Sequence, residues 1–335
     1  MSVTTSSEAA AGAAAIDWYP IVRAAILAPS SHNSQPWRFR AGGQRIDVVA
    51  DVSRRLPVVD PQDRELFISC GAAVENLVLA LRHVGRDCRV ETAPDDDPEI
   101  AARIAVTGPL TPTADDQRLY QAIPSRRTSR VSFEFLPIHR ELIDELQAAA
   151  ADRGAAFETI DDTSARNQFA HMTMTADRAQ SDDPDFRREL AAWLRPTADA
   201  SDGMPARSMG LSRFEGYLAP FVIRTFDTGG GRAARDRELI DASPLLAVIS
   251  TPGDLRRDWV DAGRALQRVA LTATAAGYTL SYMNQCIEVP ECREELTLLL
   301  QTDGHPQLAL RIGRAASLPA SPRRPVAAVL EMEDG

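Results

Sequence analysis

Residues 28–40 read Ala-Pro-Ser-Ser-His-Asn-Ser-Gln-Pro-Trp-Arg-Phe-Arg, and no other stretch gathers small hydroxyls, side-chain amides, a histidine and a tryptophan so closely. The serines and amides offer hydrogen-bond donors and acceptors within a few positions. Pro29 and Pro36 restrict the backbone at both ends of the stretch. This composition predicts a stiff polar loop. It serves either as a site for a polar, planar ligand or as a well-capped connection between a helix and a strand.

The overall composition indicates a folded chain that does not work on nucleic acid. Of its 335 residues 44% are hydrophobic, and the formal net charge is −10. An acidic chain is a poor partner for nucleic acid or for an anionic membrane. No apolar run is long enough to span a bilayer, and residues 1–15 lack the pattern of a signal peptide. We therefore expect a disordered leader at 1–15, a cytoplasmic location, and small molecules as partners.

The reactive side chains exclude several kinds of chemistry. The four cysteines have no C-x-x-C spacing and the five histidines are scattered, so neither a disulfide framework nor a metal site is predicted. The chain has no lysine, and all 37 basic residues are arginine. This excludes a Schiff-base lysine and a Walker A loop. Arginine still leaves phosphate binding open.

Apolar periodicity predicts a chain that mixes helices and strands. The expected helices cover 17–27, 66–84, 117–123, 137–151, 163–180 and 259–276, and the expected strands cover 46–50, 88–92, 101–107, 157–160, 245–250, 278–283 and 307–313. Residues 181–240 have weak periodicity and many Gly, Pro, Asp and Arg, which is typical of an insertion.

Two of the expected helices resemble each other. The segment from Gly71 to Gly85 matches the segment from Gly263 to Gly277 at a constant offset, and apolar positions fall on apolar positions. This echo predicts two related halves, 16–110 and 117–335, with the second carrying the insertion at about 181–240. Chance similarity between two amphipathic helices is the alternative.

Several motifs resemble the FMN-dependent nitroreductase superfamily. The loop at 28–37 is similar to a signature loop of that family, and Arg126-Arg127-Thr128-Ser129-Arg130 resembles its Arg-Arg-Ser-x-Arg motif. Leu310-Arg311-Ile312-Gly313, with the arginine-bearing tail after it, resembles the C-terminal strand and tail. The run Asp60-Pro61-Gln62-Asp63-Arg64-Glu65 is similar to the long actinobacterial Acg-type subgroup.

The order of these motifs departs from the family pattern. In typical members the arginine motif precedes the loop within one subunit, and the flavin lies between two subunits. Here the loop lies in the first half and the arginine motif in the second. The resemblance therefore implies a nitroreductase-like α+β fold in which two halves are fused into an intramolecular pseudo-dimer. It also implies one FMN per chain and a monomer, with a homodimer as the alternative.

The resemblance also implies where the cofactor binds. We expect arginines to offset a phosphate of about two negative charges, and amides and hydroxyls to satisfy the flavin ring. A stretch after a strand, Tyr282-Met283-Asn284-Gln285, is expected near flavin N5. The expected cofactor-binding residues are Ser30, Ser31, His32, Asn33, Gln35, Arg126, Arg127, Thr128, Arg130, Met283, Asn284, Arg323 and Arg324.

The implied activity leaves two alternatives. Hydride transfer through a flavin needs no protein base, so no catalytic residue is named. In the first alternative, reducing equivalents pass from NAD(P)H to a nitroaromatic or a quinone in a ping-pong reaction. In the second, the insertion covers the flavin, and the protein stores or sequesters FMN with little turnover.

Overall fold

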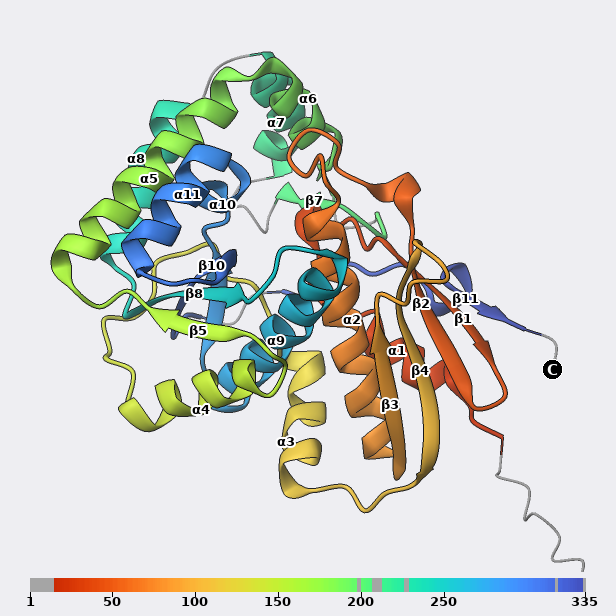
Figure 1. Ribbon diagram of the computed structural model, residues 1–335. Coiled ribbons are helices and arrows are strands. Elements are labelled where there is room, and N and C mark those ends of the chain that lie inside the picture. Colours follow the sequence, from red (N-terminus) through yellow and green to blue (C-terminus); the bar gives the residue numbers. More distant parts are fainter. Residues whose placement is uncertain (1–14, 198–199, 207–212, 226–228, 317–318, 334–335) are drawn as a thin grey trace, which may run out of the picture.

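The computed structural model describes residues 15–197, 200–206, 213–225, 229–316 and 319–333, so nearly all of the leader expected at 1–15 lies outside the described residues. Two larger sheets lie on either side of two long helices, α2 (Arg64–His83) and α9 (Arg256–Ala275), which cross at the centre (Figure 1). The strands within each larger sheet are mainly antiparallel, and helices cover them. This arrangement confirms the predicted α+β class.

The first sheet belongs mainly to the front of the chain and has the strand order β11-β1-β2-β4-β3. Its strands are β1 (Trp37–Gly42), β2 (Arg45–Ala50), β3 (Arg86–Thr92), β4 (Ile100–Pro109) and β11 (Leu330–Met332). Helix α1 (Trp18–Ala25) begins where the Asp17 side chain accepts a hydrogen bond from the Tyr19 amide, and α3 (Ala114–Ala122) follows the sheet.

Two strands of this sheet differ from the sequence prediction. Strand β1 directly continues the polar loop, and its residues alternate between buried and half-buried, which the prolines and arginines around it concealed. The tail, assigned to the second half, returns to the first sheet, where Phe39 is in register with Leu330 in a parallel pair. The first sheet therefore takes strands from both ends of the chain.

The second sheet has the order β5-β8-β10-β9 and carries most of the remaining helices. Its strands are β5 (Ala156–Thr159), β8 (Leu245–Thr251), β9 (Thr279–Tyr282) and β10 (His305–Gly313). The helices are α4 (Arg140–Ala151), α5 (Thr163–Asp182), α8 (Gly229–Asp241), α10 (Gln285–Glu288) and α11 (Pro290–Leu300).

The weakly periodic insertion contains regular structure where it is described. It forms α6 (Pro184–Ala192), α7 (Arg213–Thr225) and a small parallel pair, β6 (Leu194–Arg195) with β7 (Met204–Pro205). Phe186 and Leu190 of α6 join Leu56 and Val59 of the first half in a small separate hydrophobic core. Packing against the first half, rather than a strong sequence pattern, stabilises these short helices.

Helices α2 and α9 touch backbone to backbone where they cross. A Cβ atom on Gly71 would overlap the carbonyl oxygen of Val260, and a Cβ on Gly263 would overlap the carbonyl oxygen of Ile68. Only glycine permits this approach. The two contacts are reciprocal, since Ile68 and Val260 are 192 positions apart, as are Gly71 and Gly263.

The same offset relates the neighbouring contacts of the two helices. Phe67 and Trp259, also 192 positions apart, face each other with ring centroids at 6.4 Å. One turn further on, Gln267 Nε2 donates to Asn76 Oδ1 at 2.6 Å. The mirrored pair, Glu75 and Arg268, lies at 3.4 Å. Reciprocal contacts of this kind are what a two-fold axis between equivalent helices produces.

Helix α2 is long and apolar enough to cross a membrane by length and composition alone, although no uncharged apolar run of that length occurs in the sequence. In the fold, 89% of its most apolar 18-residue window is buried inside the protein. The helix is therefore part of the hydrophobic core, where it packs on α9 and α1.

Candidate functional site

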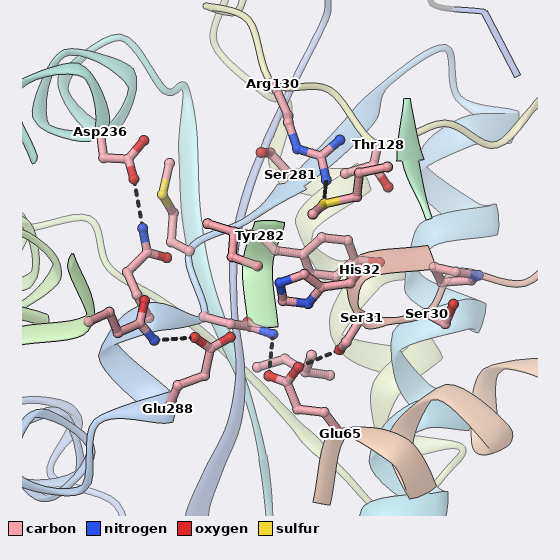
Figure 2. A pocket seen from close by; sticks show the side chains of 18 of the residues that line it. Ser30, Ser31, His32, Glu65, Thr128, Arg130, Asp236, Ser281, Tyr282 and Glu288 are labelled. Carbon is pink, nitrogen blue, oxygen red and sulfur yellow. Dashed lines mark hydrogen bonds between the residues drawn. The ribbon is translucent and has the colours of Figure 1, made fainter. Parts of the chain in front are cut away.

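A cavity of about 350 Å³ lies where the polar loop meets β9, β10 and α10. Its volume falls in the range of ligand pockets, roughly 300–1,000 Å³. Figure 2 shows Ser30, Ser31 and His32 of the loop on the side of the cavity opposite Asp236 and Glu288. Seven of the expected site residues line it: Ser30, Ser31, His32, Thr128, Arg130, Met283 and Asn284.

A smaller pocket of about 100 Å³ adjoins this cavity and shares Pro29, Thr128, Arg130 and Met204 with it. Asn33 from the loop and Arg126 from the arginine motif both line the smaller pocket. Residues 93 positions apart in the sequence thus meet in one cleft. Its other polar lining residues include Arg127, Ser321 and Arg323.

The polar loop adopts an unusual backbone. His32, Asn33 and Gln35 have φ angles of 51°, 53° and 52°, in the left-handed region that non-glycine residues rarely adopt. Each such residue costs of order 1–3 kcal/mol unless its surroundings hold it there. The Ser30 hydroxyl accepts from the Gln35 amide at 2.9 Å, which helps to fix the turn. Such strain is typical of binding loops.

Two of the expected loop ligands bond mainly to the protein itself. The Asn33 amide donates to the carbonyl oxygens of Gly203 and Pro322, at 2.9 and 3.2 Å, and its Oδ1 accepts from Arg323 at 2.9 Å. Asn33 therefore lies by the smaller pocket and not against the larger cavity.

Gln35 and Arg324, also expected to bind the ligand, line neither cavity. Gln35 Oε1 accepts from the Arg324 amide at 2.8 Å, and Arg324 lies 3.6 Å from Asp51. Their expected contact with a ligand stays a prediction, and both side chains connect the loop to the tail instead of lining a cavity. The reason is that Gln35 is fully buried beneath the loop.

Three arginines of the smaller pocket, Arg126, Arg130 and Arg323, have no carboxylate partner among the described residues. The Nε atoms of Arg126 and Arg323 are buried without a hydrogen-bond partner. Burial, together with the charges of Arg126 and Arg127, lowers the pKa of Arg323 to about 9. A cluster of unneutralised, partly unsatisfied guanidinium groups fits an anion such as a phosphate.

The second sheet positions the arginine motif. Thr128 forms a parallel bridge with Leu280 of β9, and the Ser129 amide donates to the Leu280 carbonyl at 2.9 Å. The Thr279 hydroxyl donates to the Arg127 carbonyl at 3.0 Å. The motif thus runs along the edge strand β9. Thr128 and Arg130 of the motif line the cavity together with Met283 and Asn284.

Several polar residues that the sequence did not single out as ligands also line the cavity, among them Glu65, Gln180 and Glu288. Glu65 accepts hydrogen bonds from the Ser31 hydroxyl and from Asn284 Nδ2, the latter at 3.1 Å (Figure 2). Glu65 lies in the Asp-Pro-x-Asp-Arg-Glu run, and the resemblance of that run to a family subgroup is the sequence feature that points to this residue. Gln180 and Glu288 lie on ordinary amphipathic helices and gave no signal.

Arg311 of β10 also lines the cavity, although it is fully buried. Its Nη2 donates to the Val131 carbonyl at 3.1 Å, and its guanidinium lies over the Phe133 ring at 4.6 Å. Among the described residues, its Nε and Nη1 have no hydrogen-bond partner. Burial lowers the pKa of Arg311 to about 10. The cavity wall therefore offers donors that the protein itself leaves unsatisfied.

The insertion closes one side of the cavity. Phe186, Leu190 and Ile223, from α6 and α7, line it together with Met204. The Glu189 carboxylate accepts from the amides of Val58 and Val59 at 3.0 Å each. These contacts hold α6 against the first half.

A second attachment involves the β6–β7 segment. Asp202 pairs with Arg54 of the first half and, at 2.9 Å, with Arg195. Both guanidinium groups lie over the Trp193 ring, at 5.5 and 5.7 Å. The insertion is therefore fixed over the cavity by charge and by packing.

Comparison with known proteins identifies relatives that are similar over most of the chain. No protein-family model matches it. The Mycobacterium tuberculosis protein Rv3131, whose name assigns it to the NAD(P)H nitroreductases, is 31% identical over 318 residues, which cover 93% of this chain and 90% of the relative. The acg protein of the same organism, named in the same way, is 28% identical over 310 residues, covering 91% and 92%.

Solved structures give a partial overlap. The FMN-dependent nitroreductase NfnB of Mycobacterium smegmatis, in complex with NADPH, aligns at 16% identity with a TM-score of 0.40, covering 64% of this chain and 92% of that chain. The sequence likeness to Rv3131 extends over nearly the full length of both proteins. On that ground, the chain belongs to the NAD(P)H nitroreductase family.

Proposed function

We propose that the protein is an FMN-dependent oxidoreductase that passes reducing equivalents from NAD(P)H to an electron-poor acceptor, such as a nitroaromatic or a quinone. The observation that carries this proposal is the pair of adjoining cavities. The smaller pocket holds Arg126, Arg130 and Arg323, which pair with no carboxylate in the described part of the chain, and it adjoins a larger cavity of ligand size. Arg126, Arg127, Arg130 and Arg323 would hold the FMN phosphate. Ser30, Ser31, His32, Met283 and Asn284 would face the ring system.

FMN, when bound, supplies the redox chemistry of the reaction. The chain supplies binding, orientation and restricted access. The buried arginines repel one another without an anion, so a phosphate dianion relieves that repulsion when it binds. The strained loop holds its hydroxyls in place before the ligand arrives, which reduces the entropy cost of binding.

The binding part of this proposal is tested by flavin content. Purified protein should be yellow or take up added FMN. Arg126→Ala should weaken FMN binding about 10- to 100-fold, because a hydrogen bond to a charged group contributes about 1.5–3 kcal/mol. Arg140→Ala, which changes an exposed arginine of α4, should bind FMN as the unmodified protein does. Unchanged affinity in Arg126→Ala would mean that the phosphate binds elsewhere.

We infer a second candidate, FMN storage, from the way the insertion is attached. The anchors at Glu189 and Asp202 hold it over the cavity, where it would hinder a nicotinamide. Anaerobic NADPH separates the two functions. Bleaching of the flavin by NADPH, with recovery on adding a quinone, supports the enzyme. Flavin that bleaches with dithionite alone supports storage, and Asp202→Ala should then speed reduction by NADPH.

We also propose that the two halves arose by duplication and form an intramolecular pseudo-dimer with one site. The reciprocal contacts of α2 and α9 at a single offset support this proposal. One FMN per chain and the mass of one chain in light scattering are the expected results. Two FMN molecules per chain would contradict it.

A further inference from the structure

Two carboxyl groups meet on the wall of the larger cavity, Glu65 from α2 and Glu288 from α10 (Figure 2). Their side chains are within hydrogen-bonding reach of each other. Glu65 is almost fully buried, whereas Glu288 is half-buried. Two ionised carboxylates this close repel each other, which favours a proton on one of them.

The other partners show which carboxyl group carries the proton. Glu65 accepts from the Ser31 hydroxyl, from Asn284 Nδ2 at 3.1 Å and from the Arg64 guanidinium at 3.3 Å. Three donors, one of them charged, thus occupy the carboxylate oxygens of Glu65. Glu288 accepts from the Gln180 amide, and its other neighbour is the Glu65 carboxylate. The acid form therefore belongs to Glu288.

The charges around Glu288 agree with this assignment. Burial, and then the charge of Glu65, raises the pKa of Glu288 well above its usual value. The charged groups on the elements around it are Glu65 and Arg64 of α2, Asp177 of α5, Arg235 and Asp236 of α8, and Arg311 of β10. Asp177 and Asp236 both accept hydrogen bonds from the Gln285 amide.

The same cavity has independent evidence for a polar ligand. Arg311 is fully buried on its wall, and its Nε and Nη1 have no hydrogen-bond partner. Buried guanidinium donors are rarely left unsatisfied in a folded protein, and a bound ligand with acceptor oxygens would satisfy them. The acid at Glu288 therefore faces a space in which a ligand with oxygen atoms fits.

We propose that Glu288 donates a proton to the electron acceptor and that Glu65 is the positioning residue that keeps Glu288 in the acid form. This inference rests on the proposed oxidoreductase function. A quinone that accepts one hydride equivalent from the reduced cofactor needs one further proton to become a hydroquinone. The O–H bond of Glu288 breaks, the proton goes to the quinone oxygen, and water reprotonates the resulting carboxylate. The Asp-Pro-x-Asp-Arg-Glu run then has a role, since it supplies Glu65 and its partner Arg64.

The proposal separates two classes of acceptor. Quinones and nitroaromatics gain protons with their electrons, so they need the acid. Ferricyanide gains one electron and no proton, so it does not. A protein with Glu288→Gln keeps the size of the side chain and still offers Glu65 a hydrogen-bond donor, but it has no carboxyl proton to give.

The test uses the full chain loaded with FMN, reduced by dithionite and mixed with an acceptor. Glu288→Gln should slow reoxidation by a benzoquinone about 100-fold, in the range found for a positioned general acid. Reoxidation by ferricyanide should change less than about twofold. Glu291→Gln, an exposed glutamate at the start of α11, is the matched control and should leave both rates unchanged. Equal slowing with both acceptors, or no slowing with either, would overturn the proposal.

A second readout does not depend on turnover. Infrared spectra of the cofactor-free protein at neutral pH should contain a protonated-carboxyl band that shifts in D₂O and is lost in Glu288→Gln. The same band in the variant, or none in the unmodified protein, would also overturn the assignment. A protein that binds no FMN would instead refute the proposed function, while the infrared result would still test the proton on Glu288.

Discussion

Helices α2 and α9 cross in the same way but differ at their N-terminal ends. Their glycines, aromatic residues and buried polar pairs make reciprocal contacts at one offset of 192 residues. At the end of α2, Arg64 and Glu65 are buried beside the cavity. At the matching positions of α9, Arg256 donates to the Pro98 carbonyl near the surface and Arg257 is exposed. The comparison teaches that two helices with reciprocal contacts at their crossing can differ outside it, where only one of them borders the cavity.

The largest effect is expected where the helices are alike. Gly71→Ala and Gly263→Ala should each destabilise the protein by about 4 kcal/mol, because a Cβ at either position overlaps a backbone oxygen of the other helix. Urea unfolding measures this loss. Gly231→Ala is the control, since no atom lies within 4 Å of a Cβ placed there. A large loss of stability at only one of the two glycines would contradict the prediction that the two contacts are equivalent.

The next effect concerns the N-terminal ends, where the helices differ. Glu65→Ala should cost about 3 kcal/mol, because it leaves the buried Arg64 guanidinium without its carboxylate. Arg257→Ala, at the matching position of α9, should change the free energy of unfolding by less than about 0.5 kcal/mol, since that side chain is exposed. Similar losses in the two variants would mean that both ends carry a buried ion pair.

A smaller effect distinguishes the two mirrored polar contacts at the helix crossing. Asn76→Ala should cost about 2 kcal/mol, because it leaves the fully buried Gln267 amide without its acceptor. Arg268→Ala removes the mirrored contact but should cost about 1 kcal/mol, because Glu75 keeps two hydrogen bonds from Arg153 at 2.8 Å. Thermal unfolding of both variants checks this order. The reverse order would show that the charged contact dominates.

The last prediction is a pH dependence of stability that involves Glu288 of α10, on the cavity wall beside the N-terminal end of α2. Between its usual pKa of 4.5 and its raised value, Glu288 binds more protons in the folded than in the unfolded chain. Stability contributed by this proton therefore falls as pH rises, by at most about 1.4 kcal/mol per pH unit. Glu288→Gln should lose less stability than the unmodified protein between about pH 5 and 8. Asp60, whose pKa is raised to about 6, titrates in both proteins, so its contribution cancels when the two stability curves are compared. Parallel stability curves would contradict the raised pKa.

Much of the site could be predicted because chemistry-bearing residues cluster in the sequence. The loop at 30–33 and the motif at 126–130 stand out by composition, and the structure brings both to adjoining cavities. The roles of Gln35 and Arg324 could not be predicted, because the left-handed backbone of the loop turns Gln35 inward, toward the tail. Glu288 could not be predicted either, since one glutamate on a short amphipathic helix is ordinary until α2 places a second carboxylate beside it.

The sequence by itself determined the α+β class, the long helices and the family, because periodic apolar residues and dense polar motifs are local features of the chain. Only the tertiary structure decided that the tail joins the first sheet, that two glycines let α2 and α9 touch, and that Glu65 and Glu288 share one cavity wall. The physical reason is that local sequence fixes the shape of each element, whereas burial next to a distant element determines the charge state and hydrogen-bond partners of a side chain.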